Sequence, residues 1–497
     1  MNKYIDIPKY TNINTILNNN FSLSASQYKS LCITNKNVKP LNDLLDRNLN
    51  RQDLGIEIGS NSYIDKSNYY FIKTKALQSD SYLFSINKES FQPMIASEFK
   101  NMDLKKGDII ISKDSNVGEA VILDKDYPQC MLSSALYKLP ISNNKYYILA
   151  FIKSDLFRQQ IDFLVPKGAT IRHGKTMFLN CLIPFPKNNN VIDYVELLVK
   201  SIINKETEIR NKFNAIQTMI KDELITNQKE IDFSYSYPSI NEIQSLNRLD
   251  SCLYSKEFKQ QQFLINNYLY GASTISQLGF NTPTRGQNLQ VSCIGKSIRS
   301  LNYKEDYYKL LLPCYISKYG TISFEEYLGN KNKLKVLNYG EIVFGAEGNE
   351  KGRSYILLDN DIKSITNIHG ITIAPSKNGI QKSIFIKLFL DYLRTTGMID
   401  KYAVGGNGGS LAIKYWDLLT FPNFPKDKEK QITDLYHKEN ISYNPSDCTN
   451  DNFLEYDTNF NKNAGIYDID KSLKYIKSLL DDVIHKIIND KDIEIKY

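Results

Sequence analysis

The sequence lacks most of the features that assign a protein to a chemical class at once. Its 497 residues include four histidines and seven cysteines, and none of these share the spacing of a metal site. An odd cysteine count without a secretory signal predicts free thiols in a reducing compartment. The first residues contain no continuous apolar core, so we expect no signal peptide. No run approaches the ~20 apolar residues of a membrane span, and we expect a cytoplasmic protein without membrane contact.

Catalytic motifs are scarce as well. The stretch GATIRHGKT (168–176) has five residues between its glycines, whereas a nucleotide-binding P-loop has four and opens a helix. An adenine methyltransferase needs an Asn/Asp-Pro-Pro-aromatic loop, and the nearest string is YNPSD (443–447). Two functional classes stay open at this point. One is a DNA-modifying or DNA-cleaving enzyme with a cryptic site, and the other is a protein scaffold that binds no nucleic acid.

Composition and length set the scale of the fold. The chain is 42% hydrophobic and 24% charged, which is ordinary for a soluble globular protein. A chain of 497 residues is too long for one core, so two or three domains are expected. The net charge of +7 permits a polyanionic partner without requiring one.

An internal repeat organises the chain. The stretch KKGDIIISKDSNVGEAVIL (105–123) returns as NYGEIVFGAEGNEKGRSYIL (338–357). In both, a glycine and an acid precede an apolar run, a polar loop and a second glycine. The match extends to LSASQYKSL (23–31) with LDSCLYSKEF (249–258), and to KGATIRHGKTMFLNCLIPFPK (167–187) with GGNGGSLAIKYWDLLTFPNFPK (405–426). The stretch GIEIGSNSYID (55–65) has no clear counterpart in the second copy.

Each copy combines strand and helix patterns. The runs DIIIS, AVIL, YYILAFI, EIVFG and SYILL are short, apolar and closed by turn residues, which predicts strands. Helical stretches are expected at 147–163 and 380–396. The repeated glycines Gly107, Gly118, Gly340 and Gly352 are expected to form turns between strands. Each copy is therefore predicted to be an α+β domain.

A long helix follows each copy. Residues 191–225 carry two apolar heptad columns, and Glu206 interrupts one of them. This pattern predicts a coiled-coil helix. The second helix is expected to begin within 426–440, to be interrupted by a polar insertion at 441–469, and to resume at 470–490. We expect the two apolar stripes to pack against each other; they comprise Val195, Ile202, Ile209, Phe213, Ile216 and Ile220 on one side and Leu473, Ile476, Leu480, Ile484 and Ile487 on the other.

The predicted architecture is thus a pseudo-two-fold α+β protein with two similar domains on long antiparallel helices. The expected segments are domain one (1–188), helix one (189–232), domain two (233–426) and helix two (427–497). Two similar domains held apart by helices suit a partner with repeating geometry, and duplex DNA is such a partner.

Three groups of polar loops are candidates for DNA contact, because they carry residue types that bind phosphates or base edges. An ordinary solvated loop remains the alternative for each group. The candidate residues are Lys113, Asn116, Asn349, Lys351 and Arg353 after the repeated strands, Arg172, His173 and Lys175 in the basic loop, and Arg285, Gln287 and Asn288 in NTPTRGQN (281–288).

The order of these motifs, LSASQY, GDIIIS, IPFP and a long helix, then RLDSCLYS, GEIVFG, TFPNFPKDKEKQI and a second helix, resembles the specificity subunit of type I restriction-modification enzymes. The resemblance covers roughly 20–230 and 245–490. It implies two target-recognition domains that each read half of a split DNA site. It also implies helices that set the spacer and dock DNA adenine methyltransferase subunits, and through them restriction motor-nuclease subunits. The family's subunit is non-catalytic and holds no cofactor; S-adenosylmethionine, ATP and Mg²⁺ belong to its partners.

Overall fold

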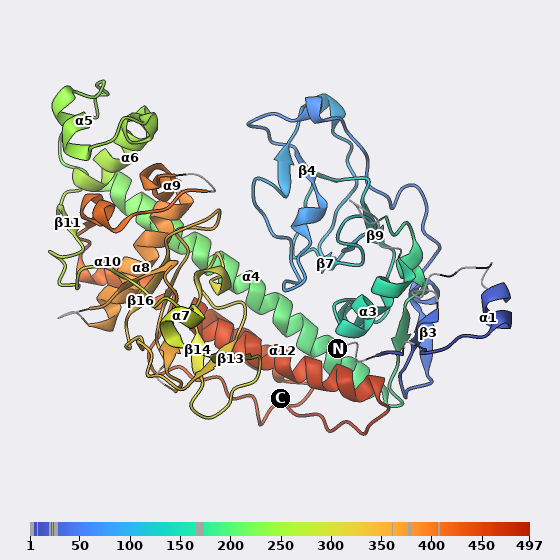
Figure 1. Cartoon of the computed structure of the whole chain (residues 1–497). Coiled ribbons are helices and arrows are strands. Elements are labelled where there is room, and N and C mark those ends of the chain that lie inside the picture. The colour runs from blue at the N-terminus through green and yellow to red at the C-terminus, as the bar shows by residue number, and fades with distance from the viewer. Residues whose placement is uncertain are drawn as a thin grey trace. The chain divides into compact units, whose positions relative to one another are not determined.

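The computed structural model describes residues 4–497, except residues 7, 19–20, 22, 24–27, 166–172, 360, 376–378 and 406–407. The chain divides into two compact units. Unit 1 comprises Met1–Glu208, Tyr443–Asn463 and Lys471–Tyr497, and unit 2 comprises Ile209–Ser442 and Ala464–Asp470. Both units contain helices and sheets, so each is α+β as the sequence predicts (Figure 1).

Unit 1 is built on two small sheets among its described residues. The first has the order β5 (Phe91–Pro93), β4 (Tyr70–Ile72), β8 (Cys130–Leu132), with β4 antiparallel to β5 and parallel to β8. The second is antiparallel, with the order β7 (Ala120–Ile122), β6 (Ile109–Ser112), β9 (Leu136–Leu139). Two further pairs join β1 (Ile5–Asp6) to β2 (Ser30–Leu31) and β3 (Val38–Pro40) to β10 (Leu182–Pro184).

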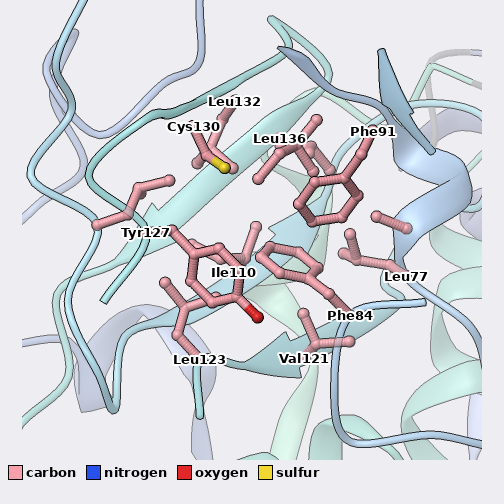
Figure 2. Close-up of a cluster of buried hydrophobic side chains, with 13 residues drawn as sticks. Leu77, Phe84, Phe91, Ile110, Val121, Leu123, Tyr127, Cys130, Leu132 and Leu136 are labelled. Atoms are coloured by element: carbon pink, nitrogen blue, oxygen red, sulfur yellow. The ribbon is translucent and has the colours of Figure 1, made fainter. Parts of the chain in front are cut away.

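Buried side chains from both sheets form one core in unit 1. Phe91 and Leu132 from the first sheet meet Ile110 and Val121 from the second, with Phe84 between them (Figure 2). The Phe84 and Phe91 rings meet edge to face, with 5.6 Å between their centroids, a favourable geometry for aromatic pairs. The alternate apolar residues of short strands therefore supply the core.

Unit 2 repeats this topology. Its first sheet has the order β13 (Ser297–Ser300), β15 (Tyr327–Asn330), β14 (Tyr308–Leu310), β18 (Ser364–Ile365), and β14 is again antiparallel to one neighbour and parallel to the other. Its second has the order β12 (Thr284–Arg285), β19 (Gly370–Ile373), β16 (Ile342–Gly345), β17 (Ser354–Ile356). A separate pair joins β11 (Ala272–Thr274) to β20 (Thr420–Pro422). Strands β12 and β13 extend sheets that otherwise match those of unit 1.

A close main-chain contact recurs at Gly55 and Gly286. The Gly55 N–H donates to Leu136 O, and the Gly286 N–H donates to Gly370 O, both at 2.9 Å; Leu136 and Gly370 begin the matching strands β9 and β19. A Cβ atom at either glycine would lie 2.0 or 2.3 Å from a carbonyl oxygen, so only glycine fits. The structure therefore gives Gly55 a counterpart in Gly286, although the sequence shows no clear counterpart of GIEIGSNSYID because the flanking side chains differ.

The helices are partly as expected. Described helices are α1 (Ile13–Asn18), α2 (Lys145–Ile152), α3 (Asp155–Leu164), α4 (Asn189–Thr226), α5 (Ile240–Leu246), α6 (Lys256–Asn266), α7 (Val291–Ile294), α8 (Ile380–Thr395), α9 (Met398–Tyr402), α10 (Lys426–Asp434), α11 (Phe453–Asn463) and α12 (Ile466–Ile488). The long helix expected at 191–225 is α4, and the one expected at 380–396 is α8.

The strand expected for YYILAFI (146–152) is wrong, because this run lies in α2. Residues Tyr147–Ile152 are all buried, and a helix buried on every side shows no 3.6-residue apolar period. The helix expected at 147–163 is also two helices. Ser154 separates them, since its hydroxyl accepts from the Phe157 N–H and caps α3.

Helix α12 runs antiparallel to the first half of α4 within unit 1 (Figure 1). Lys205 Nζ lies 2.8 Å from Ser472 Oγ, and Glu206 Oε1 lies 2.9 Å from Lys477 Nζ. Nearer the start of α4, the Tyr194 hydroxyl donates to the carbonyl of Lys496, which lies in the C-terminal segment after α12. The apolar stripe residues of these segments, Val195, Ile202, Ile476, Leu480, Ile484 and Ile487, are all buried.

The second half of α4 has a different partner. In unit 2, Phe213 meets the ring of Tyr319 edge to face, and Gln217 accepts a hydrogen bond from Thr395. Glu223 accepts from the Tyr268 hydroxyl at 2.7 Å. The expected pairing with α12 therefore describes the first half of the α4 stripe, and the second half packs on the globular part of unit 2. The reason is that α12 is shorter than α4. Lys205, near the middle of α4, already contacts Ser472 near the start of α12, so α12 does not reach the second half of α4.

The polar insertion expected at 441–469 is helical in its second part, which contains α11 and the start of α12, whereas residues 441–452 form no helix. Asp457 and Asn461 face inward from α11 and are buried. Asp457 Oδ1 lies 2.7 Å from Lys205 Nζ, with both side chains fully buried, and Asp457 Oδ2 accepts from Ser201. Burial lowers the pKa of Lys205 to about 8. Polar residues thus take two of the four buried positions of α11, beside Phe453 and Phe460, and this obscures its helical pattern in the sequence.

Candidate nucleic-acid interface

Three loops that are far apart in sequence meet around Glu347 in unit 2. Glu347 follows β16, and its Oε1 accepts from Arg285 Nη1 at 2.6 Å. Its Oε2 lies 2.7 Å from His369 Nδ1. Arg285 also donates to Ile368 O at 2.9 Å, while Ser410 of the glycine-rich loop forms a β-bridge with Glu347. The structure therefore gathers NTPTRGQN, AEGNEKG and the described part of GGNGGS at one place.

A cavity of about 690 Å³ opens beside this cluster. The residues that line it include Cys314, Glu347, Asn349, His369 and Ser410. Gly348 and Gly409 bring two main chains close together, since the Gly348 N–H donates to Gly409 O at 3.3 Å. The loop after the repeated strand β16 thus forms one wall of this recess, which several polar residues line.

Unit 1 carries the matching cluster around Asp114, after β6. Its Oδ2 is paired with Lys113 Nζ, and its Oδ1 lies 2.9 Å from His173 Nδ1. Backbone contacts show that the positions are equivalent. The Gly174 N–H donates to Lys113 O at 2.7 Å, as the Leu411 N–H donates to Ala346 O at 2.9 Å. Each unit therefore holds a carboxylate, a histidine and a cation at the same point of the repeat.

The electrostatics of Glu347 follow from its neighbours. Burial by itself raises the pKa of this carboxyl, but the hydrogen bonds from His369 and Arg285 outweigh it and hold the pKa below the ordinary value. Glu347 is consequently an ionised acceptor at neutral pH. The carboxylate of Glu347 balances the charge of Arg285. The guanidinium is therefore a hydrogen-bond donor with a fixed orientation rather than a free surface charge.

Two other predicted cations of unit 2 also lie in ion pairs. Lys351 Nζ is 2.5 Å from Asp400 Oδ1, and the lysine side chain is 8% exposed. Arg353 pairs with Glu350 and donates to Ile316 O at 2.9 Å. These contacts hold the loop after β16 in shape.

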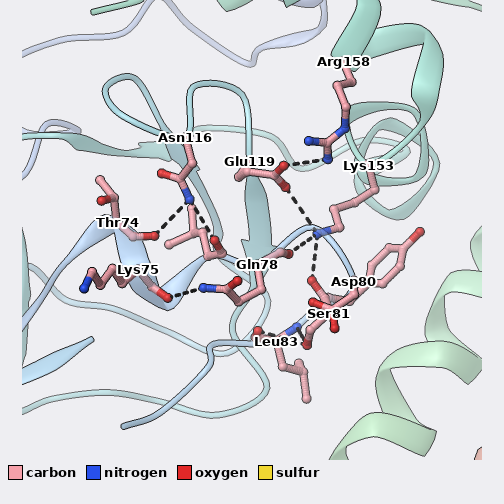
Figure 3. A network of polar contacts seen from close by, with 12 residues as sticks. Thr74, Lys75, Gln78, Asp80, Ser81, Leu83, Asn116, Glu119, Lys153 and Arg158 are labelled. Atoms are coloured by element: carbon pink, nitrogen blue, oxygen red, sulfur yellow. Dashed lines mark hydrogen bonds and ion pairs between the residues drawn. The ribbon is translucent and has the colours of Figure 1, made fainter. Parts of the chain in front are cut away.

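The predicted amides have local partners. Asn116 donates to Thr74 O and Leu77 O at 3.1 and 2.8 Å (Figure 3). Gln287 Oε1 accepts from the Lys335 N–H, and Asn288 Oδ1 accepts from the Gln290 N–H. Asn349 is exposed at the loop tip. Asn116, Gln287 and Asn288 therefore shape the loops, and Asn349 has its side chain at the surface.

The basic loop of unit 1 is only partly described. His173 lies in the Asp114 cluster, and Lys175 is exposed with a left-handed backbone (φ 46°). Arg172 lies outside the described residues. A second loop of unit 1, at 78–83, is held by Lys153, which donates to Gln78 O and Ser81 O. Lys153 also pairs with Glu119, and Arg158 contacts Glu119 at 2.6 Å (Figure 3).

Sequence reasoning missed the two carboxylates and His369. The available signal was positional, since Asp114 and Glu347 both stand six residues after the acid of the repeated Gly-acid pair, at Asp108 and Glu341. In the described part of the chain, no three His, Cys, Asp or Glu residues are grouped to hold a metal ion. None of the helices described there has the length and apolar character of a bilayer span.

Comparison with protein-family models and with curated proteins finds no match. Among solved structures, the S subunit of a type I restriction-modification system from M. genitalium is similar over 92% of this chain and 96% of its own, with 13% identity and a TM-score of 0.40. The HsdS subunit from Thermoanaerobacter tengcongensis is similar over 84% of this chain and 90% of its own, with 10% identity and a TM-score of 0.26. A structure from work on assembly and conformational transition of the type I R-M system is similar over 91% of this chain and 97% of its own, with 10% identity and a TM-score of 0.26. At these values, function has to be argued from the chain's own residues.

Proposed function

We propose that this chain is the DNA-specificity subunit of a type I restriction-modification enzyme. Each unit reads one half of a bipartite DNA sequence, and α4 and α12 set the unread spacer between the halves. The observation that carries the proposal is the duplication itself. Two units share one strand pairing and one loop site, yet the residues in those sites differ. A duplicated reader with unlike contacts suits an asymmetric split site.

The sites suit base reading better than simple phosphate attraction. The electrostatic part of phosphate binding comes from Lys and Arg charges that neutralise phosphates, whereas the charges of Lys113, Arg285, Lys351 and Arg353 are each paired with a carboxylate. Donors and acceptors fixed in direction, such as Glu347 and Arg285 beside the recess, are the groups that distinguish base edges. The remaining net charge of +7 supplies general attraction to DNA.

The chemistry belongs, on this proposal, to partner subunits. A methyltransferase subunit would use S-adenosylmethionine, and a motor-nuclease subunit would use ATP and Mg²⁺. A duplicated apolar feature supports a partner that binds twice. The motif Tyr-x-x-Ile-Asn-x-Ile occurs in each unit, and its first tyrosine and isoleucine are exposed in both, as Tyr10 and Ile13 in unit 1 and Tyr237 and Ile240 in unit 2. Exposed apolar side chains of this kind mark protein contacts.

A domain exchange tests the function. Residues 245–425 would be replaced by the matching segment of another specificity subunit, and genomic methylation would be mapped in the host with its partner subunits present. We expect one half of the methylated sequence to change and the other half to stay as in the wild type. The reciprocal exchange of 1–188 is the matched control and should change the opposite half. Loss of the gene without loss of any sequence-specific methylation would refute the proposal.

A further inference from the structure

We propose that Asp114 and Glu347 are base-contacting residues, each accepting a hydrogen bond from the exocyclic amine of adenine or cytosine in its own half-site. This inference rests on the proposed function, because it assigns a base class to the site of each unit. It goes further by naming carboxylates, rather than the cations around them, as the reading groups.

Position is the first support. Asp114 and Glu347 occupy the same place after β6 and β16, and each forms a β-bridge with the glycine-containing loop, to His173 and to Ser410. The neighbouring residues have diverged, since Lys113 corresponds to Ala346 by its backbone contacts. Both units therefore have a carboxylate at this position, although the preceding residue is a lysine in one unit and an alanine in the other.

Hydrogen-bond capacity is the second support. An ionised carboxylate accepts at two oxygens with about four lone-pair sites. Among the described residues, each oxygen of Glu347 receives one donor, from Arg285 or His369. Each oxygen of Asp114 likewise receives one, from Lys113 or His173. Both carboxylates are therefore fixed in direction and retain acceptor sites for a ligand.

Electrostatics decide the class of ligand. A carboxylate repels phosphate, so an acid kept at the meeting point of the loops opposes backbone binding there. A base edge that donates a hydrogen bond is favoured instead. In the major groove, such donors are the adenine N6 and cytosine N4 amines. The cavity beside Glu347, with Asn349 and Ser410 in its lining, offers further polar groups to the same edge.

The test uses Glu347→Gln and Asp114→Asn in the complete enzyme in its host, with methylated sequences mapped genome-wide. We expect Glu347→Gln to relax one adenine or cytosine position in the half-site read by unit 2, with discrimination reduced roughly tenfold. Asp114→Asn should do the same in the other half. The unaltered half reports that each variant is folded and assembled.

A matched control is Glu305→Gln, which changes an exposed carboxylate of unit 2 that lies outside the cavity and outside the candidate loops. It should leave the methylated sequence unchanged. If Glu347→Gln lowered methylation at all sites without altering the sequence, the carboxylate would only position Arg285 and the inference would be overturned. The wild-type map is independent of these variants, so failure of the proposed function would be visible separately as absence of gene-dependent methylation.

Discussion

In unit 1 the carboxylate of Asp114 is held by a histidine from the glycine-containing loop, whereas in unit 2 Glu347 is held by a histidine from the turn before β19. The cations also come from different places, Lys113 from the adjacent position and Arg285 from β12. The strand pairing around both sites is the same. Main-chain bonds thus preserve the framework, while the side chains that complete each site have been recruited separately.

The largest effects are expected at two buried ion pairs, one in each unit. Lys205 and Asp457 are 2.7 Å apart in unit 1, and Lys387 and Asp391 are 2.8 Å apart in unit 2, all almost fully buried. Removing one partner leaves an unpaired buried charge, so Lys205→Met and Lys387→Met should each lower the free energy of unfolding by about 3–5 kcal/mol. Denaturant titration followed by circular dichroism measures this.

A double variant sharpens that comparison. Lys205→Met with Asp457→Leu removes both charges and should recover most of the loss, because a hydrophobic replacement of a buried pair is often neutral. Helix α11 reaches α4 through Asp457, whereas Lys387 and Asp391 lie on one helix, α8. If the double variant were as unstable as Lys205→Met, the Lys205–Asp457 attraction would not be the cause.

Intermediate effects are expected at the matched glycines. Gly55→Ala and Gly286→Ala place a methyl group against a carbonyl oxygen, and such overpacking costs about 1–3 kcal/mol. Gly59→Ala is the control, since no atom lies within 4 Å of its added Cβ. Thermal unfolding should show similar losses for the first two variants and none for the third. A loss at Gly55 alone would break the equivalence of the two units.

The smallest effect concerns acid sensitivity at Asp53, whose counterpart two residues before Gly286 is Thr284. Burial by itself raises the pKa of Asp53, but the Arg47 guanidinium and the Asn50 N–H hold the pKa below its ordinary value of 3.8. A carboxylate with a lowered folded pKa adds stability above its unfolded pKa and loses it as pH falls through the folded value.

Asp53→Asn should therefore lower the stability of unit 1 above about pH 5, and its difference from the wild type should shrink below pH 3.8. Urea titrations at several pH values measure this. Thr284→Val is the matched change in unit 2 and should show no such pH dependence. A constant difference for Asp53→Asn at every pH would mean that its charge is not responsible.

Much of the framework could be predicted from sequence because it follows local patterns. The heptads located α4, and the repeated Gly-acid runs located β6 and β16. The misses share a physical cause. Helix α2 is buried on all sides, and α11 buries polar residues, so neither shows the expected apolar period. Apolar periodicity appears only where buried residues are apolar and exposed residues are polar; α2 has no exposed position, and α11 has polar residues at two of its four buried positions.

The candidate site was predictable only in outline. Most of the loops were identified by their polar residue types, and in unit 2 the fold brings NTPTRGQN (281–288), AEGNEKG (346–352) and the described part of GGNGGS (405–410) together around Glu347. Which side chain takes which partner depends on long-range contacts such as Arg285 with Glu347, and no local pattern encodes them. Glu206 shows the same limit. It interrupts a heptad column because it accepts from the Tyr82 N–H and from Ser81, attaching a loop of unit 1 to α4.

The close contacts at Gly55 and Gly286 involve main-chain atoms alone. They require glycine at that one position in each unit and do not restrict the side chains of the neighbouring residues. Mutation or recombination can rewrite the adjacent loop residues while the chain still folds. Under the proposed function, a lineage carrying such a protein would acquire a new target sequence in few genetic steps, and each half of the target would evolve at its own pace.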